Sequence, residues 1–163
     1  MIREANKSDV INLVALSLEV WFKTYCYDGI TSENSKYALS MFTEQYFHNL
    51  ITNKNYRIFV YTDGIYLRGY VLINLDSQFN KFNVGFEIEK FYVHSEYQGK
   101  WIGAKLLNEV KAKVGDKFWL YTWVRNQSID FYEHFGFQDT GEYQFTLGNE
   151  VIDNRGFAFS GNS

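Results

Sequence analysis

The stretch that decides the fold is EIEKFYVHSEYQGKWIGAKLLN, residues 87–108. It begins within a run rich in aromatic and β-branched residues, 86–94, that predicts a buried strand. A short turn follows, and from Trp101 onward apolar residues recur at the spacing of one buried helical face. A helix N-terminus presents unpaired N–H groups and the positive end of the helix dipole, so a glycine-containing turn leading into a helix suits a phosphate. The stretch therefore predicts a strand, a phosphate-binding turn and a helix.

The composition limits the kind of protein that this chain can be. Its 163 residues suit one domain, 1–163, with a substantial core. A net charge of −3 gives no general affinity for nucleic acid or for an anionic membrane, so we expect neither as a partner. The single cysteine, Cys26, cannot form an internal disulfide, and no signal peptide or transmembrane run is evident, which together predict the cytoplasm. No His, Cys, Asp and Glu spacing resembles a metal site, so we expect no metal.

The remaining elements follow from hydrophobic periodicity. Asn6 is expected to cap a first helix, with Asp9 reaching back to the cap. A second helical region is expected at 31–50, and a short helix starting at Asn126 or Gln127. Strands are expected at 2–5, 56–61, 65–75, 86–94 and 118–124, then from Phe137, with 143–147 and 156–159 as a closing pair. The order β-α-α-β-β-β-α-β-α-β-β predicts an α/β fold with a mixed sheet.

Two motifs carry a family resemblance. Residues 98–104, QGKWIGA, are similar to a Q/R-x-x-G-x-G/A pyrophosphate loop, and residues 131–137, FYEHFGF, match an F-Y-x-x-x-G-F signature. With this element order, the chain resembles the GNAT superfamily of acetyl-CoA-dependent N-acetyltransferases. The resemblance implies an α/β (α+β) fold with a mixed, mostly antiparallel central sheet of about six to seven strands, flanked by about four helices. Residues 144–148 with Asp153 are loosely similar to bacterial polyamine (spermidine/spermine) acetyltransferases.

The resemblance also implies an activity and a cofactor site. The activity is transfer of an acetyl group from acetyl-CoA to a primary amine of a small-molecule acceptor, by direct attack in a ternary complex. Backbone N–H groups would bind the pyrophosphate from Gln98, Gly99, Lys100, Trp101, Ile102, Gly103 and Ala104. The strand residues Phe91, Tyr92 and Val93 would pair with the pantetheine arm, and an N–H near Tyr92 or Val93 would face the thioester oxygen.

One residue of the loop departs from the family pattern. Trp101 stands where the motif has its first glycine. A glycine there lets the backbone approach the pyrophosphate closely. In the first turn of the helix a residue other than glycine can still adopt helical dihedrals, so the loop can bind the pyrophosphate if the indole points away from it.

Three residues are candidates for the chemistry. Tyr132 is the candidate general acid for the leaving thiolate. Glu87 and Glu89 are candidate bases, directly or through water, and as strand residues two apart they are expected to share a face. Both could instead recognise a cationic acceptor. Family members often carry an asparagine seven residues before this tyrosine; that position is Arg125 here, so Arg125 or Asn126 could cap the short helix or touch the cofactor arm.

Two other functions remain open from the sequence. The chain could be a non-catalytic sensor that binds acyl-CoA, or a protein or peptide N-acetyltransferase. Aromatic side chains on the closing strands could support a homodimer.

Overall fold

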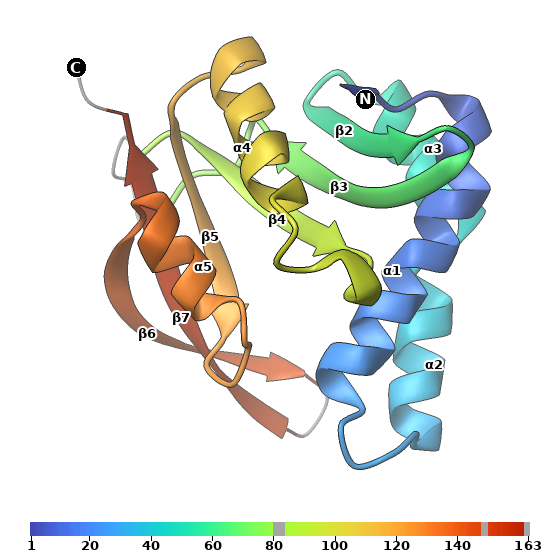
Figure 1. The fold of residues 1–163 in the computed structure, drawn as a ribbon. Coiled ribbons are helices and arrows are strands. Elements are labelled where there is room, and N and C mark those ends of the chain that lie inside the picture. The colour runs from blue at the N-terminus through green and yellow to red at the C-terminus, as the bar shows by residue number, and fades with distance from the viewer. Residues whose placement is uncertain (80–83, 148–149, 162–163) are drawn as a thin grey trace.

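The fold is a seven-stranded sheet with helices on both faces (Figure 1), and the computed structural model describes residues 1–79, 84–147 and 150–161. Within these residues the strands lie in the order β1-β2-β3-β4-β5-β7-β6. All neighbouring pairs are antiparallel except β4 and β5, which run parallel. The predicted mixed, mostly antiparallel sheet is therefore confirmed. The strands are β1 (Ile2–Glu4), β2 (Tyr56–Asp63), β3 (Tyr66–Asn74), β4 (Phe86–Val93), β5 (Lys117–Trp123), β6 (Gln138–Leu147) and β7 (Glu150–Ser160).

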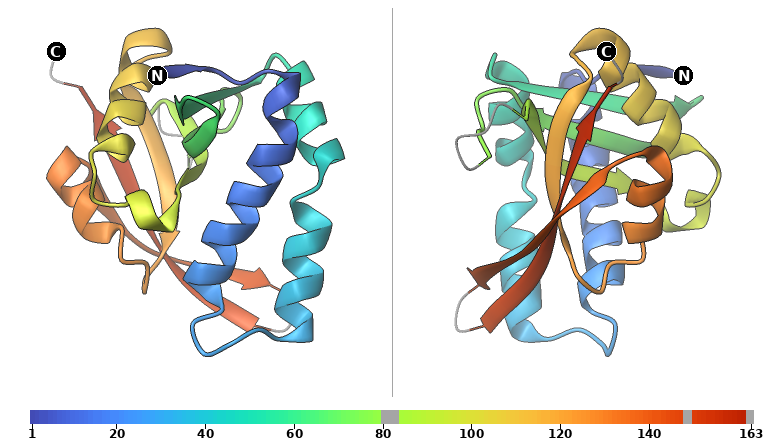
Figure 2. Two further views of the ribbon diagram at one scale, coloured as in Figure 1. Left: turned by 45° about the vertical axis from the view of Figure 1, so that its right-hand side comes forward. Right: turned by 90° about the vertical axis from the view of Figure 1, so that its left-hand side faces the viewer.

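Helices cover both faces of the sheet (Figure 2). They are α1 (Val10–Tyr25), α2 (Ser32–Met41), α3 (Glu44–Thr52), α4 (Ile102–Lys113) and α5 (Ile129–Phe135). The helices α1, α2 and α3 pack on one face over a core that includes Leu13, Phe47 and Tyr70. The helices α4 and α5 pack on the other face, over a core that includes Leu106 and Phe157.

The parallel strands β4 and β5 pair at their first residues and then diverge. Their register contains only Phe86 with Phe118 and Glu87 with Trp119. Beyond these two pairs the facing edge of β4 has no neighbouring strand, so its backbone groups remain available. The divergence of β4 from β5 is the feature that positions the candidate site.

A β-bulge in β4 changes which face of the sheet its side chains point to. Leu72 of β3 pairs with Lys90, and the next residue of β3, Ile73, pairs with Ile88, so Glu89 is the additional residue. Ile88 and Phe91 consequently face the core beneath α4, although they are three residues apart. Glu89 and Lys90 both face the side covered by α1, α2 and α3.

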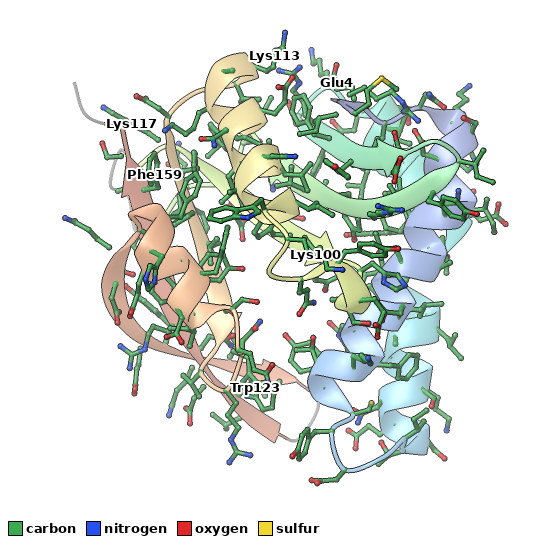
Figure 3. All side chains as sticks on the ribbon, viewed as in Figure 1. Glu4, Lys100, Lys113, Lys117, Trp123 and Phe159 are labelled. Carbon is green, nitrogen blue, oxygen red and sulfur yellow. The ribbon has the colours of Figure 1, made fainter. Side chains whose placement is uncertain are left out.

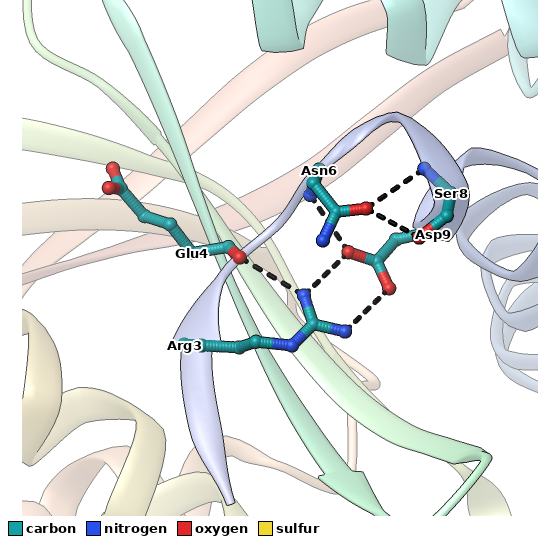
Figure 4. Close-up of polar contacts among 5 residues, drawn as sticks. All are labelled: Arg3, Glu4, Asn6, Ser8 and Asp9. Carbon is teal, nitrogen blue, oxygen red and sulfur yellow. Dashed lines mark hydrogen bonds and ion pairs between the residues drawn. The ribbon is translucent and has the colours of Figure 1, made fainter.

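The start of α1 follows the predicted capping pattern (Figure 4). The Asn6 side-chain oxygen accepts from the Ser8 N–H at 2.9 Å, and the Asn6 N–H donates to the Asp9 carboxylate at 2.8 Å. The Arg3 guanidinium also binds that carboxylate with two hydrogen bonds, of 2.7 and 2.9 Å. These contacts hold the pKa of Asp9 below its usual value and attach the helix to β1.

Several element boundaries differ from expectation. The expected helical region 31–50 is two helices, because Phe42 leaves helical dihedrals and Thr43 caps α3 by accepting from the Tyr46 N–H. The last short helix begins at Ile129, later than expected. The strand expected from Phe137 begins at Gln138 and continues through 143–147 as the single strand β6, and its partner β7 begins at Glu150, before the expected 156. Gly148 of the C-terminal similarity lies outside the described residues.

Across residues 1–79, 84–147 and 150–161, none of the helices has the length and apolar character required to cross a bilayer.

The junction at which β4 meets β5 gives a stability prediction. Gly85 precedes β4 with φ of 87°, and a Cβ there would lie 1.7 Å from the Lys117 carbonyl oxygen. We expect Gly85→Ala to lower the free energy of unfolding by roughly 3 kcal/mol or more, because it adds backbone strain and a clash with backbone. Urea unfolding followed by tryptophan fluorescence measures the change.

The control is Gly64→Ala in the β2–β3 turn. Gly64 also has a positive φ, 59°, but no atom lies within 4 Å of its added Cβ. We expect a loss of about 1 kcal/mol there. Equal losses at the two glycines would contradict the proposed clash at the junction.

Candidate functional site

The diverging edge of β4 turns the backbone groups of Phe91 and Val93 away from β3. The His94 N–H donates to the Arg68 carbonyl on β3 at 2.8 Å. Since hydrogen-bonded and non-hydrogen-bonded pairs alternate in an antiparallel ladder, Tyr92 also bonds to β3, whereas Phe91 and Val93 direct their N–H and C=O groups toward β5. At that level β5 is no longer paired with β4, so an extended ligand could add to this edge as a strand.

The turn after β4 leads into an uncapped helix N-terminus. The Lys105 N–H donates to the Trp101 carbonyl at 3.0 Å, so the N–H groups of Ile102, Gly103 and Ala104 precede the first helical bond of α4. The N-cap residue Trp101 makes no side-chain cap bond. The donor set therefore fits a phosphate group, as the sequence predicts.

The polar side chain of the loop turns back to the strand. The Gln98 Nε2 donates to the Val93 carbonyl at 3.0 Å and so links the turn to the open edge. The Lys100 ammonium lies 5.1 Å from the centroid of the Tyr97 ring, and Figure 3 shows Lys100 just before α4 and Trp123 at the end of β5.

Trp101 does not adopt the helical dihedrals expected from the sequence. Its φ and ψ are 68° and 0°, the left-handed conformation, and it is the one residue other than glycine with a positive φ in the described part of the chain. This conformation costs a non-glycine residue about 1–2 kcal/mol. A glycine in this place avoids that cost, which gives a physical reason for the motif's preference. The side chain is 77% exposed, so the indole points out of the core.

Gly103 is required by packing as well as by its position in the loop. An added Cβ would lie 3.0 Å from the Phe91 ring and 3.3 Å from the Phe131 ring. The close approach of these rings brings the first turn of α4 against β4 and α5.

A pocket of about 840 Å³ extends from this loop along the open edge of β4. One wall is the segment from Arg125 to Phe135 and another is the C-terminal half of α1. Glu19 of α1 accepts hydrogen bonds from the N–H and hydroxyl of Ser95, which fixes α1 to the turn after β4. The lining residues include Val93, Gln98, Gly99, Trp101, Gly103, Ala104, Asn126 and Tyr132.

Tyr132 lies where this pocket meets a second, smaller one. The second pocket, of about 100 Å³, lies between β4 and β5, and five residues line both: Tyr25, Phe91, Tyr92, Asn126 and Tyr132. Tyr132 is 5% exposed, and its hydroxyl has no hydrogen-bond partner among the protein groups that the structure describes. Burial raises the pKa of Tyr132 well above its usual value, so the phenol keeps its proton at neutral pH.

Sequence reasoning missed Tyr25, which packs on Trp123 at a centroid separation of 5.4 Å. The signal for it was weak, because Tyr25 continues the apolar helical face of α1 and so resembles a core residue. Asn126 takes part in local structure, since its side-chain oxygen accepts from the Ser128 N–H at 2.9 Å. It thus makes a turn that precedes α5 while also lining both pockets.

The two glutamates share the predicted face but differ in position. Glu89 lines the smaller pocket and accepts from the Asn74 amide at 2.8 Å. Glu87 lies nearer the paired start of β4 and β5 and is not among the residues that line either pocket. Burial raises the pKa of Tyr56, and both carboxylates add to that increase, so both lie near its phenol.

Burial also perturbs two charged groups of this face. Burial raises the pKa of Glu87 above its ordinary value of 4.5, although a hydrogen bond with Ser77 opposes the increase. Burial lowers the pKa of Lys90, whose ammonium lies 5.6 Å from the centroid of the Phe42 ring. A carboxylate and an ammonium with perturbed pKa values beside a pocket are typical of functional sites.

Within the described parts of the chain, no group of three or more His, Cys, Asp or Glu residues is arranged to hold a metal ion.

Comparison with known proteins identifies the class. Residues 54–139 match the sequence model of the acetyltransferase (GNAT) domain, over more than half of the chain. The chain therefore belongs to the GNAT acetyltransferase family, as its two motifs predict. It is also 26% identical over 156 residues to an uncharacterised N-acetyltransferase in the pepI 3′ region of Lactobacillus delbrueckii subsp. lactis, with 90% of this chain and 89% of that relative covered.

Solved structures share the fold. The PaiA N-acetyltransferase of Thermoplasma acidophilum, determined in complex with coenzyme A, has a TM-score of 0.74 at 21% identity, with 94% of this chain and 96% of that chain covered. YncA of Salmonella typhimurium, determined with its cofactor acetyl-CoA, has a TM-score of 0.66 at 19% identity, with 98% and 92% covered. At these identities the similarity establishes the architecture and leaves the acceptor open.

The raised pKa of Glu87 predicts a pH-dependent stability difference. An acid whose pKa is raised by folding favours its protonated form in the folded state. Its stabilising contribution is therefore complete below pH 4.5 and is lost as the pH rises through the folded pKa. Glutamine cannot ionise. The free energy of unfolding of Glu87→Gln, relative to that of the wild type, should therefore increase from pH 4 to pH 7, as measured by urea unfolding.

Glu133→Gln, at an exposed position of α5, controls for the loss of one negative charge. Identical pH profiles for Glu87→Gln and Glu133→Gln would contradict the burial effect at Glu87.

Proposed function

We propose that this chain transfers the acetyl group of acetyl-CoA to a primary amine of a small-molecule acceptor, by direct attack in a ternary complex. The observation that carries the proposal is the meeting of two pockets at Tyr132, between diverging strands whose open edge leads to an uncapped helix N-terminus. One pocket suits the cofactor and the other suits the acceptor. We further propose that residues 1–163 act as a single domain in the cytoplasm.

The cofactor would be held mainly by backbone groups. The N–H groups at the start of α4 would bind the pyrophosphate, and the Phe91 N–H and C=O and the Val93 N–H would pair with the pantetheine arm, since the Val93 carbonyl already accepts from Gln98. The alternation along β4 favours Val93 over Tyr92 as the N–H donor to the thioester oxygen, because the Tyr92 N–H faces β3.

The chain's own groups would then move protons. Acetyl-CoA supplies the acetyl thioester, and the acceptor nitrogen forms a bond with the carbonyl carbon as the carbon–sulfur bond breaks. Tyr132 would give its proton to the leaving thiolate, which suits a phenol that remains protonated at neutral pH. A carboxylate would accept the proton that the ammonium group must lose before attack. The nitrogen loses a second proton as the amide forms, and this proton would return to the Tyr132 phenolate.

Glu89 and Glu87 lie at different places, so they would take part in proton removal in different ways. Glu89 lines the acceptor-side pocket and is oriented by Asn74, which supports direct or water-mediated proton transfer. Glu87 lies farther from the junction of the pockets, so it would act through water or through the local charge. The raised pKa of Glu87 also suits a base that operates near neutral pH.

Features of the structure bear on two questions, whether the chain catalyses acetyl transfer and which acceptor it would use. The strained Trp101 and the locally bonded Asn126 are consistent with an acyl-CoA sensor that lacks turnover. The small volume of the acceptor-side pocket, about 100 Å³, favours a small amine over a peptide segment. Polyamine-like and amino-sugar acceptors are therefore the first candidates to test.

The first experiment measures thiol release from acetyl-CoA with a panel of small primary amines. Tyr132→Phe should lower kcat by about 10²- to 10⁴-fold and leave the Kd for acetyl-CoA unchanged, because the ring remains and only the proton donor is lost. Tyr70→Phe is the matched control, since Tyr70 is a fully buried tyrosine that bonds to Ser17 and lines neither pocket. Binding of acetyl-CoA without turnover of any amine would favour the sensor.

A second experiment separates the two glutamates. Glu89→Gln should lower kcat/KM by about 10²-fold, because the residue beside the acceptor can no longer take a proton. Glu87→Gln should give a smaller decrease in kcat/KM. A larger loss in Glu87→Gln would reverse the assignment.

A further inference from the structure

Trp101 is strained without any compensating contact in the free protein. Its left-handed backbone is unfavourable for a residue with a side chain, and the indole is 77% exposed. Neither the ring nor its Nε1 has an aromatic, cation–π or hydrogen-bond partner among the described residues. Strain that packing does not offset is characteristic of a residue whose interaction forms only when a ligand binds.

The position of Trp101 indicates which part of a ligand it would meet. It lines the larger pocket directly before the free N–H groups of Ile102, Gly103 and Ala104. From those groups the open edge of β4 leads inward to Tyr132. A pyrophosphate bound at the start of α4 would send its pantetheine arm inward, so the nucleoside on its other side must lie outward, at the rim that Trp101 forms.

We propose that the Trp101 indole stacks on the adenine ring of the coenzyme A nucleotide, which makes it a binding residue for the outer half of the cofactor. This inference rests on the proposed function. A planar indole with one free face is suited to a purine, and stacking of a base on an aromatic side chain is a substantial contribution to nucleotide binding. This contact explains why the loop has a tryptophan at a position where glycine would avoid the strain of the left-handed backbone.

The test compares coenzyme A with 4′-phosphopantetheine, which lacks adenine. Isothermal titration calorimetry gives the Kd of each ligand for the wild type, Trp101→Ala and Trp101→Phe. Both substitutions keep a non-glycine residue in the left-handed position, so backbone strain is matched. Trp101→Ala should weaken coenzyme A binding about tenfold and leave 4′-phosphopantetheine binding unchanged, while Trp101→Phe should stay within about threefold of the wild type for both.

Tryptophan fluorescence gives a readout that does not depend on activity. Trp21 and Trp119 are buried and Trp123 is half-buried, so Trp101 is the indole most accessible to acrylamide. Coenzyme A should protect the wild-type fluorescence from quenching, and 4′-phosphopantetheine should not.

The outcomes separate this inference from the proposed function. Unchanged coenzyme A affinity in Trp101→Ala, or equal weakening of both ligands, would overturn the stacking contact while acetyl transfer by the wild type stands. If the wild type binds no coenzyme A at all, the proposed function fails together with the inference.

Discussion

The divergence of β4 from β5 is the constraint on which the candidate site depends. A parallel pair would ordinarily satisfy the backbone along both strands, but here pairing stops after Glu87. The N–H and C=O of Phe91 and the N–H of Val93 can therefore bind a ligand in place of a strand. The same divergence opens the sheet, so that a pocket on each side can meet at Tyr132. Gly85 allows the paired ends of β4 and β5 to approach closely at Lys117, and the site lies at the open end.

The turn after β4 is held by a hydrogen bond to the strand and contains a strained residue. Gln98 links the turn to the open edge, and the first N–H groups of α4 remain free because no side chain caps them. Left-handed residues at Gly99 and Trp101 bring the chain sharply from the strand into the helix. Glycine meets this requirement without cost, and tryptophan does not. The exposed indole at the pocket rim is the feature that distinguishes this loop from the family pattern.

The acceptor side is organised by the β-bulge in β4. By adding Glu89 to the strand, the bulge directs Glu89 and Lys90 to one face and keeps Ile88 and Phe91 in the core beneath α4. Two carboxylates and a buried ammonium therefore gather among aromatic side chains. Burial disfavours charge on Glu87 and on Lys90. It therefore raises the pKa of Glu87 and lowers the pKa of Lys90, which favours the uncharged form of each group.

The sequence by itself determined the strand–turn–helix at 86–114, the second motif at 131–137 and the family, because these depend on local periodicity and on residues close together in the chain. It also predicted the Asn6–Asp9 cap, which is local. Tertiary structure decided the rest. The contribution of Tyr25 to both pockets depends on the packing of α1 across the sheet, and the shared facing of Glu89 and Lys90 depends on a bulge set by pairing with β3. The left-handed Trp101 was not predicted either, because helical periodicity cannot show that the helix begins one residue later and that the chain must turn sharply before it.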